Sequence, residues 1–126
     1  MIVGDVLFTT PYDTNLNQRG LEAISPEINK LFSVSDAIIA NLESTLPAEG
    51  FISTQPRVFG TAQQFKSLKQ AHVNVVSLAN NHTFDALDSG FKKTRSKLDE
   101  LGIHSFGAGT NLEEAQKCAS FNVKGV

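Results

Sequence analysis

The stretch that decides the fold begins as Val73-Asn74-Val75-Val76-Ser77-Leu78 and continues as Ala79-Asn80-Asn81-His82-Thr83-Phe84-Asp85. The apolar, valine-rich first part predicts a buried parallel strand. The polar cluster begins where that strand ends, and polar groups near a core need partners. Because ligands bind at the carboxyl ends of strands in open parallel α/β sheets, the cluster predicts a functional site at this edge.

Composition sets broad limits on the kind of protein. The chain has 126 residues, 40% of them hydrophobic and 19% charged, which is typical of one soluble globular domain with a proper core. The formal net charge of -2 gives no basic surface for nucleic acid or an anionic membrane, so neither is an expected partner. The single cysteine, Cys118, cannot form an internal disulfide. Composition leaves the location of the protein unknown.

Strands and helices are predicted to alternate along the chain. Strands are expected at 1–8, 36–41, 73–78, 103–106 and 121–126, and a polar loop at 9–20. Alternation of this kind implies right-handed crossovers and a mostly parallel sheet flanked by helices. The chain ends inside the last expected strand, which predicts that residues 1–126 are a single, truncated domain of a larger fold.

Four helices are expected between these strands. The first starts with Ser25 as N-cap and Pro26 at the first helical position, and the second opens at Thr61. The third runs over 91–101 and stops at Gly102, and a capping box formed by residues 111–114 opens the last. The apolar faces of the first three helices are expected to consist of Ile28, Leu31 and Phe32; Ala62, Phe65 and Leu68; and Phe91, Leu98 and Leu101.

Acids and amides occur at or near the carboxyl end of each of the first three predicted strands. They are Asp5 on the first, Asn41 and Glu43 on the second, and Asn80, Asn81, His82 and Asp85 on the third. Carboxylate and amide oxygens with an imidazole suit divalent cations such as Mn, Fe, Zn or Mg. The pattern therefore predicts a metal or phosphate site at this edge of the sheet.

Four motifs carry a resemblance to a known family. They are Gly4-Asp5-Val6, Ala40-Asn41-Leu42-Glu43-Ser44-Thr45, Ser77 to Asp85, and Gly107-Ala108-Gly109-Thr110-Asn111 with Glu114-Ala115. In this order and spacing the chain resembles the bacterial capsule-synthesis family called CapA or PgsA. That family is associated with poly-gamma-glutamate and belongs to the calcineurin-like metallophosphoesterase superfamily. The resemblance implies the first half of an α/β/β/α sandwich and location at the cell envelope.

The resemblance also implies roles for individual residues. Asp5 matches a first-strand metal ligand, Glu43 a metal-bridging acid and Asn81 an amide ligand. His82 matches a histidine that contacts phosphate and protonates the leaving oxygen, and Asp85 would orient it. Asn41 and Asn80 would be neighbouring site residues; turn chemistry after the strand is an alternative for Asn41 and Glu43, and closing the turn is one for Asn80. Two metal ions, of Mn, Fe, Zn or Mg, would serve a phosphorylated or polyanionic substrate.

The chain departs from the family pattern at two places. Family members often carry an aromatic-glycine pair directly after the aspartate that matches Asp85, and this chain has Ala86-Leu87 there. Further histidine motifs complete the family's metal site, and the other histidines here, His72 and His104, lie outside such motifs. The second functional hypothesis is therefore a non-catalytic assembly or binding component, or an inactive truncated domain, of an envelope polymer machine.

Other polar residues are interpreted as structural. His72 near a helix end, His104 as a solvated strand residue, Asp36 at the opposite edge of the sheet and Cys118 as a small apolar residue on the last helix need no chemistry. The basic run at 92–97 is interpreted as a solvated helix face because acids follow it. An unpaired sheet edge would favour a homo-oligomer or contact with other capsule-synthesis proteins.

Overall fold

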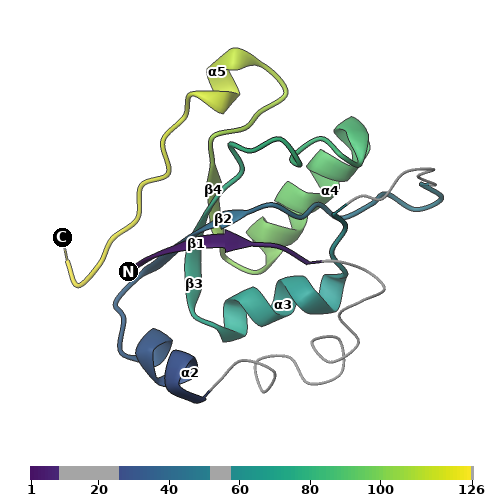
Figure 1. Cartoon of the computed structure of the whole chain (residues 1–126). Coiled ribbons are helices and arrows are strands. Elements are labelled where there is room, and N and C mark those ends of the chain that lie inside the picture. Colours follow the sequence, from purple (N-terminus) through teal and green to yellow (C-terminus); the bar gives the residue numbers. More distant parts are fainter. Residues whose placement is uncertain (9–25, 52–57, 126) are drawn as a thin grey trace.

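A computed structural model describes residues 1–8, 26–51 and 58–125 of the chain (Figure 1). The elements in these ranges are β1 (Ile2–Val6), α2 (Pro26–Ser33), β2 (Ile38–Leu42), α3 (Ala62–Gln70), β3 (Val73–Ser77), α4 (Leu87–Glu100), β4 (His104–Phe106) and α5 (Leu112–Ala115). The strands form one sheet in the order β1-β2-β3-β4, and every neighbouring pair is parallel. The predicted α/β class, with a parallel sheet flanked by helices, is confirmed.

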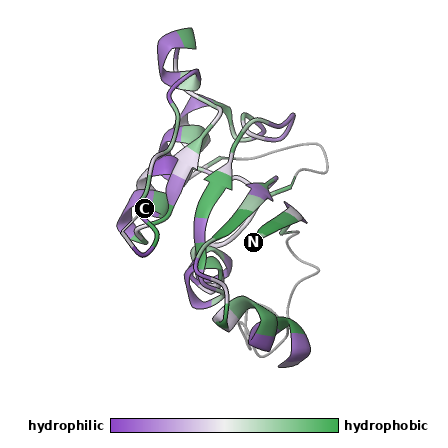
Figure 2. Cartoon of the chain, turned by 90° about the vertical axis from the view of Figure 1, so that its left-hand side faces the viewer, coloured by the Kyte–Doolittle hydropathy of each residue, from purple (hydrophilic) through white to green (hydrophobic). Residues whose placement is uncertain are grey.

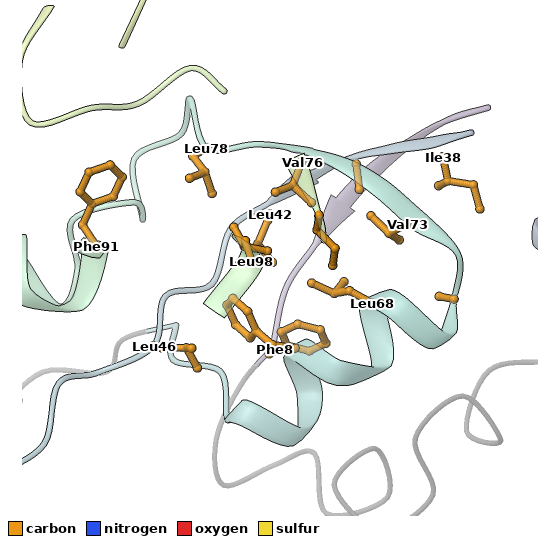
Figure 3. Close-up of a cluster of buried hydrophobic side chains, with 14 residues drawn as sticks. Phe8, Ile38, Leu42, Leu46, Leu68, Val73, Val76, Leu78, Phe91 and Leu98 are labelled. Carbon is orange, nitrogen blue, oxygen red and sulfur yellow. The ribbon is translucent and has the colours of Figure 1, made fainter. Parts of the chain in front are cut away.

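One hydrophobic core lies between the sheet and helices α3 and α4 (Figure 3). Phe65 of α3 and Phe91 of α4 are buried in it, and Phe32 of α2 packs against it. Right-handed crossovers between successive neighbours in a parallel sheet place every connecting helix on the same face. The strands are largely hydrophobic, whereas the helices show both hydrophilic and hydrophobic residues, as expected for helices that bury one stripe (Figure 2).

Local sequence explains where α3 begins. Thr61 Oγ1 accepts a hydrogen bond from the Gln64 backbone N at 3.2 Å, and Gln64 Oε1 accepts one from the Thr61 backbone N at 2.7 Å. This capping box satisfies two backbone donors that have no partner inside the helix. The helix therefore begins where Thr61 predicts.

Helix α4 is tied to the segment that follows β2. Thr94 Oγ1, which is buried, accepts a hydrogen bond from the Leu46 backbone N at 2.8 Å. Gly90 lies against the same segment, where an added Cβ would be 2.1 Å from Ala86 Cβ and 3.0 Å from Leu46 O. The approach of α4 to this segment therefore depends on the absence of a side chain at position 90.

The predicted helix faces are partly correct. Phe65, Leu68, Phe91 and Leu98 are buried as expected, Leu101 is half-buried and Ala62 is exposed. On α2 the expected apolar face is not buried: Ile28 and Leu31 are 43% and 54% exposed, and of this face Phe32 alone packs against the core. Helix α4 begins at Leu87, four residues before the expected Phe91. The expected Ser25 N-cap and the 9–20 loop lie outside the described residues.

The fifth strand expected at 121–126 is wrong for its described residues, 121–125. The Phe121 ring stacks on His104 of β4 with centroids 6.1 Å apart, and Lys124 Nζ pairs with Asp36 Oδ1 at 2.7 Å. Asn122 Oδ1 accepts a hydrogen bond from the Gly125 backbone N at 2.7 Å, and Lys124 has a φ of 52°. Side-chain capping of the backbone forms a turn, which ends the extended conformation that its apolar residues favour.

Two of the residues interpreted as structural lie where expected. His104 is an exposed strand residue, and Asp36 precedes β2 at the opposite end from the polar cluster. Cys118 is exposed and lies beyond α5, so its expected place on the last helix is wrong. None of the described helices has the length and apolar character needed to cross a membrane.

Leu87, at the start of α4, has a φ of 58° although it is not glycine. A side chain in this left-handed region costs about 1–2 kcal/mol. Its side chain is 63% exposed, so little burial offsets this cost. Leu87→Gly should therefore raise the free energy of unfolding by about 0.5–1 kcal/mol, measured by urea denaturation.

The matched control is Leu112→Gly. Leu112 is 72% exposed and lies in helix α5, outside the residues with positive φ. Glycine there has no strain to relieve and should leave the stability equal or lower. A loss of stability in Leu87→Gly would contradict the strain at this position.

Candidate functional site

The sheet register brings the ends of three strands together. Asp5 of β1 pairs with Asn41 of β2, and Asn41 pairs with Ser77 of β3. The backbone N of Glu43 donates to Val6 O at 3.0 Å, which continues the β1–β2 ladder one residue past the end of β2. The predicted acids and amides of successive strands therefore do share one edge of the sheet.

Asn41 joins the two acids of this edge. Its Nδ2 donates to Asp5 Oδ1 at 2.8 Å and lies 3.4 Å from Glu43 Oε1. Asp5 is exposed and Glu43 is half-buried. An amide NH₂ shared by two carboxylates offsets part of their mutual repulsion, because each keeps a hydrogen-bond donor. Asp5, Asn41 and Glu43 thus form one cluster.

Asn80 connects this cluster to the turn after β3. Its Nδ2 donates to Asn41 Oδ1 at 3.1 Å and to Leu42 O at 2.9 Å. Its Oδ1 accepts a hydrogen bond from the His82 backbone N at 3.0 Å. All of these partners belong to the protein, so the side chain of Asn80 links the end of β2 to the His82 turn.

His82 and Asp85 form a pair at that turn. His82 Nδ1 lies 3.0 Å from Asp85 Oδ2, and the side chains are 28% and 12% exposed. An ionised Asp85 carboxylate can only accept the hydrogen bond, so the pair favours the tautomer with the proton on Nδ1, which leaves Nε2 available to a ligand. The pairing that the motif predicts is present in the structure.

Asn81 differs from its neighbours. It is exposed, and within the described chain its side chain makes no hydrogen bond. In residues 1–8, 26–51 and 58–125, no group of three or more His, Cys, Asp and Glu side chains is placed to hold a metal ion. The oxygen donors of Asp5, Glu43 and Asn81 suit a hard divalent cation in kind.

Two buried hydroxyl groups, which were not among the predicted site residues, support the site. Thr83, 3% exposed, donates its hydroxyl to Leu78 O and lies 3.2 Å from Asn80 Oδ1. Ser44 Oγ, fully buried, accepts from the Phe8 backbone N at 2.6 Å and lies 3.1 Å from Phe8 O. Both residues lie inside the motifs. The sequence signal that could have revealed them is a small hydroxyl residue next to a proposed site residue.

Fold and site together define the class: an α/β domain with a polar cluster where its parallel strands end. The whole chain, residues 1–126, matches the family described as "Bacterial capsule synthesis protein PGA_cap". The chain belongs to this family of bacterial capsule synthesis proteins.

Three relatives illustrate the similarity. The PGA biosynthesis protein CapA of Bacillus subtilis (strain 168) is 26% identical over 98% of this chain and 34% of its own length. The capsule biosynthesis protein CapA of Bacillus anthracis is 25% identical over 99% of this chain and 32% of its own length. The Mycobacterium tuberculosis (strain H37Rv) protein named "Probable polyglutamine synthesis accessory protein" is 32% identical over 72% of this chain and 24% of its own length. The chain spans about a third or less of these relatives.

Proposed function

We propose that this chain provides part of a metal-dependent phosphoesterase-type site in a protein of capsule or poly-gamma-glutamate biosynthesis. The observation that carries the proposal is the hydrogen-bonded path from Asp5 through Asn41 and Asn80 to the backbone of His82. This path fixes the position of the acidic cluster relative to the histidine–carboxylate pair. Such an arrangement suits a reaction that needs a cation and a proton donor together.

Each residue has a role in this proposal. Asp5, Glu43 and Asn81 would hold the divalent cation, one of Mn, Fe, Zn or Mg, with further ligands from outside the described residues. When bound, such ions activate water and neutralise phosphoryl oxygens. His82 protonates the leaving oxygen through Nε2, while Asp85 holds Nδ1 and stabilises the protonated ring.

The family supports a proposal for the substrate class and the location. A phosphorylated or polyanionic small molecule or polymer suits both the cation and a histidine that carries a proton. Names of the relatives refer to PGA and capsule biosynthesis, which supports a place at the bacterial cell envelope. Partners there would be other capsule-synthesis proteins or a second copy of the chain.

The experiment that tests the metal role compares the wild type with Asp5→Asn. Asp5 is exposed, so the fold should tolerate the change. Loss of one ligand charge should weaken Mn²⁺ binding by about tenfold or more, measured by isothermal titration calorimetry. Asp36→Asn is the matched control, because Asp36 is an exposed acid whose partner is Lys124. Equal affinities in wild type and Asp5→Asn would sink the proposal.

The second candidate function is a non-catalytic assembly or binding component of an envelope polymer machine. What supports it is that the described residues contain no group of three or more His, Cys, Asp and Glu side chains placed to hold a metal ion. Metal analysis separates the two candidates: stoichiometric tight binding of two cations supports the phosphoesterase-type site, and undetectable binding supports the assembly role.

A further inference from the structure

An open groove of about 400 Å³ lies beside the polar network, between the turn after β3 and the turn after β4. One wall consists of Ala79, Asn80, Asn81 and Phe84, and the other of residues 107–109 with Ala115. Figure 1 shows that the turn after β4 leads directly into α5, at the end of the sheet where the chain also leaves β3. The groove shares Asn80 with the network, and its lining includes none of the acids.

The two walls of the groove are held close by glycine. Gly107 has a φ of 85°, and an added Cβ would lie 2.8 Å from Ala79 Cβ on the opposite wall. At Gly109 an added Cβ would lie 2.4 Å from Glu114 Cβ and 2.6 Å from the Ala115 backbone N. These distances are shorter than normal van der Waals contact, so the turn after β4 depends on the missing side chains, at Gly107 for its approach to Ala79 and at Gly109 for its approach to α5.

Glu114 fastens the second wall to helix α4. Its Oε2 accepts hydrogen bonds from the Thr110 backbone N at 3.0 Å and from Thr110 Oγ1 at 3.0 Å. The same oxygen lies 3.3 Å from Arg95 Nη1 of α4, and the Arg95 guanidinium lies 5.7 Å from the centroid of the buried Phe91 ring. The Thr110 hydrogen bonds, then Arg95 and Lys117, lower the pKa of Glu114. The carboxylate therefore stays ionised at a lower pH than an ordinary glutamate does, and its contacts with Thr110 and Arg95 persist there.

The lining of the groove has the chemistry of a site for a neutral group. None of its lining residues is charged, so an ionic group would lose water there without gaining an opposite charge. The exposed side-chain amide of Asn81 offers a donor and an acceptor, and Phe84, 44% exposed, offers an apolar ring. A ligand amide matches this set because it too presents one donor and one acceptor beside small apolar groups.

We propose that this groove is a binding subsite for an uncharged, amide-bearing group, and that Glu114 is the positioning residue that holds its second wall. The subsite rests on the proposed function in one respect: the amide would belong to the same ligand whose anionic part meets the cation that the acidic cluster would hold. An N-acetylated sugar and a peptide-like amide share this chemistry.

The experiment titrates the ¹⁵N-labelled protein, with a chelator present, with N-acetylglucosamine, with N-acetylglycinamide and with acetate. Chemical shifts of the Asn81 side-chain amide and of the Gly107 and Gly109 backbone amides should move with at least one of the two amides and not with acetate. A response to N-acetylglucosamine indicates a sugar ligand, and a response to N-acetylglycinamide indicates a peptide-like ligand. No shift with either amide, or equal shifts with acetate, would overturn the subsite.

Two variants test the residues of the groove. Ala79→Phe, which fills it, should weaken binding of the responding probe by about tenfold or more, and Gln63→Phe on the exposed side of α3 should leave it unchanged. Glu114→Gln removes the charge that holds Thr110 and Arg95. It should speed hydrogen exchange of the Thr110 amide and weaken the probe about threefold. Faster exchange with unchanged affinity would overturn the positioning role.

A third variant separates the subsite from the catalytic proposal. His82 does not line the groove, so His82→Ala should retain probe binding even if it removes hydrolysis. Loss of probe binding in His82→Ala would show that the groove is not an independent subsite. Retained probe binding in a protein that hydrolyses no phosphate ester would overturn the proposed function and leave the subsite standing.

Discussion

His82→Ala should lower the rate of Mn²⁺-dependent hydrolysis of an aryl phosphate by about 10²–10⁴-fold, the contribution expected of a positioned general acid. The His82 ring lies 3.0 Å from Asp85 through Nδ1 and is 28% exposed, so its other nitrogen can reach a ligand. Because the backbone N of His82, and not its ring, bonds to Asn80, alanine should keep the network intact. The measurement is the steady-state rate with Mn²⁺ added.

The control for this prediction is His104→Ala. His104 is exposed on β4 and contacts Phe121 outside the network, so its loss should leave the rate unchanged. Asp85→Asn should give a smaller loss than His82→Ala, because the ring remains while its orientation weakens. Equal rates in the wild type and His82→Ala would remove His82 from the proposed chemistry.

Phe65→Ala should lower the free energy of unfolding by about 3–5 kcal/mol, the range for deleting a buried phenylalanine side chain. Phe65 is 0% exposed, and its ring centroid lies 6.0 Å from that of Phe8. An added Cβ on Gly60 would lie 2.7 Å from Phe65 Cε2, which shows how closely the ring is enclosed. Alanine would therefore leave a cavity that the surrounding core cannot easily close. Urea denaturation gives the measurement.

Phe84→Ala is the matched control for stability. Phe84 is 44% exposed, and its ring contacts Phe91 with centroids 4.8 Å apart. Its removal should cost roughly 1 kcal/mol, because one aromatic contact and part of its burial are lost. A cost for Phe65→Ala no larger than that of Phe84→Ala would contradict the central place of Phe65 in the core.

Much of the site could be predicted because strand ends of a parallel sheet meet by geometry. The sequence places Asp5 and Asn41 near the carboxyl ends of two predicted strands and the polar turn at the end of a third. Parallel pairing of these strands then brings all three ends to one edge of the sheet. The resemblance to the family implied the Asp85–His82 pair, and the structure places the two side chains within hydrogen-bond distance.

Other features could not be predicted because they depend on contacts distant in sequence. Asn80 could equally have turned toward a ligand, and the carbonyl of Leu42 and the amide of Asn41 decide otherwise. The residues at 121–125 have a strand-like apolar pattern, but stacking on His104 and the pairing with Asp36 compete with strand pairing. The left-handed φ of Leu87 likewise reflects the path between the turn and α4.

The sequence by itself determined the alternation of strands and helices, the start of α3 and the family, because these depend on local periodicity, capping residues and motif spacing. Only the tertiary structure decided which polar groups of Val73 to Asp85 face each other. It directs the Asn80 side chain to the carbonyl of Leu42, leaves Asn81 exposed, and pairs Glu114 with Arg95. The physical reason is that a buried polar atom takes whichever partner the packed backbone places within hydrogen-bond distance.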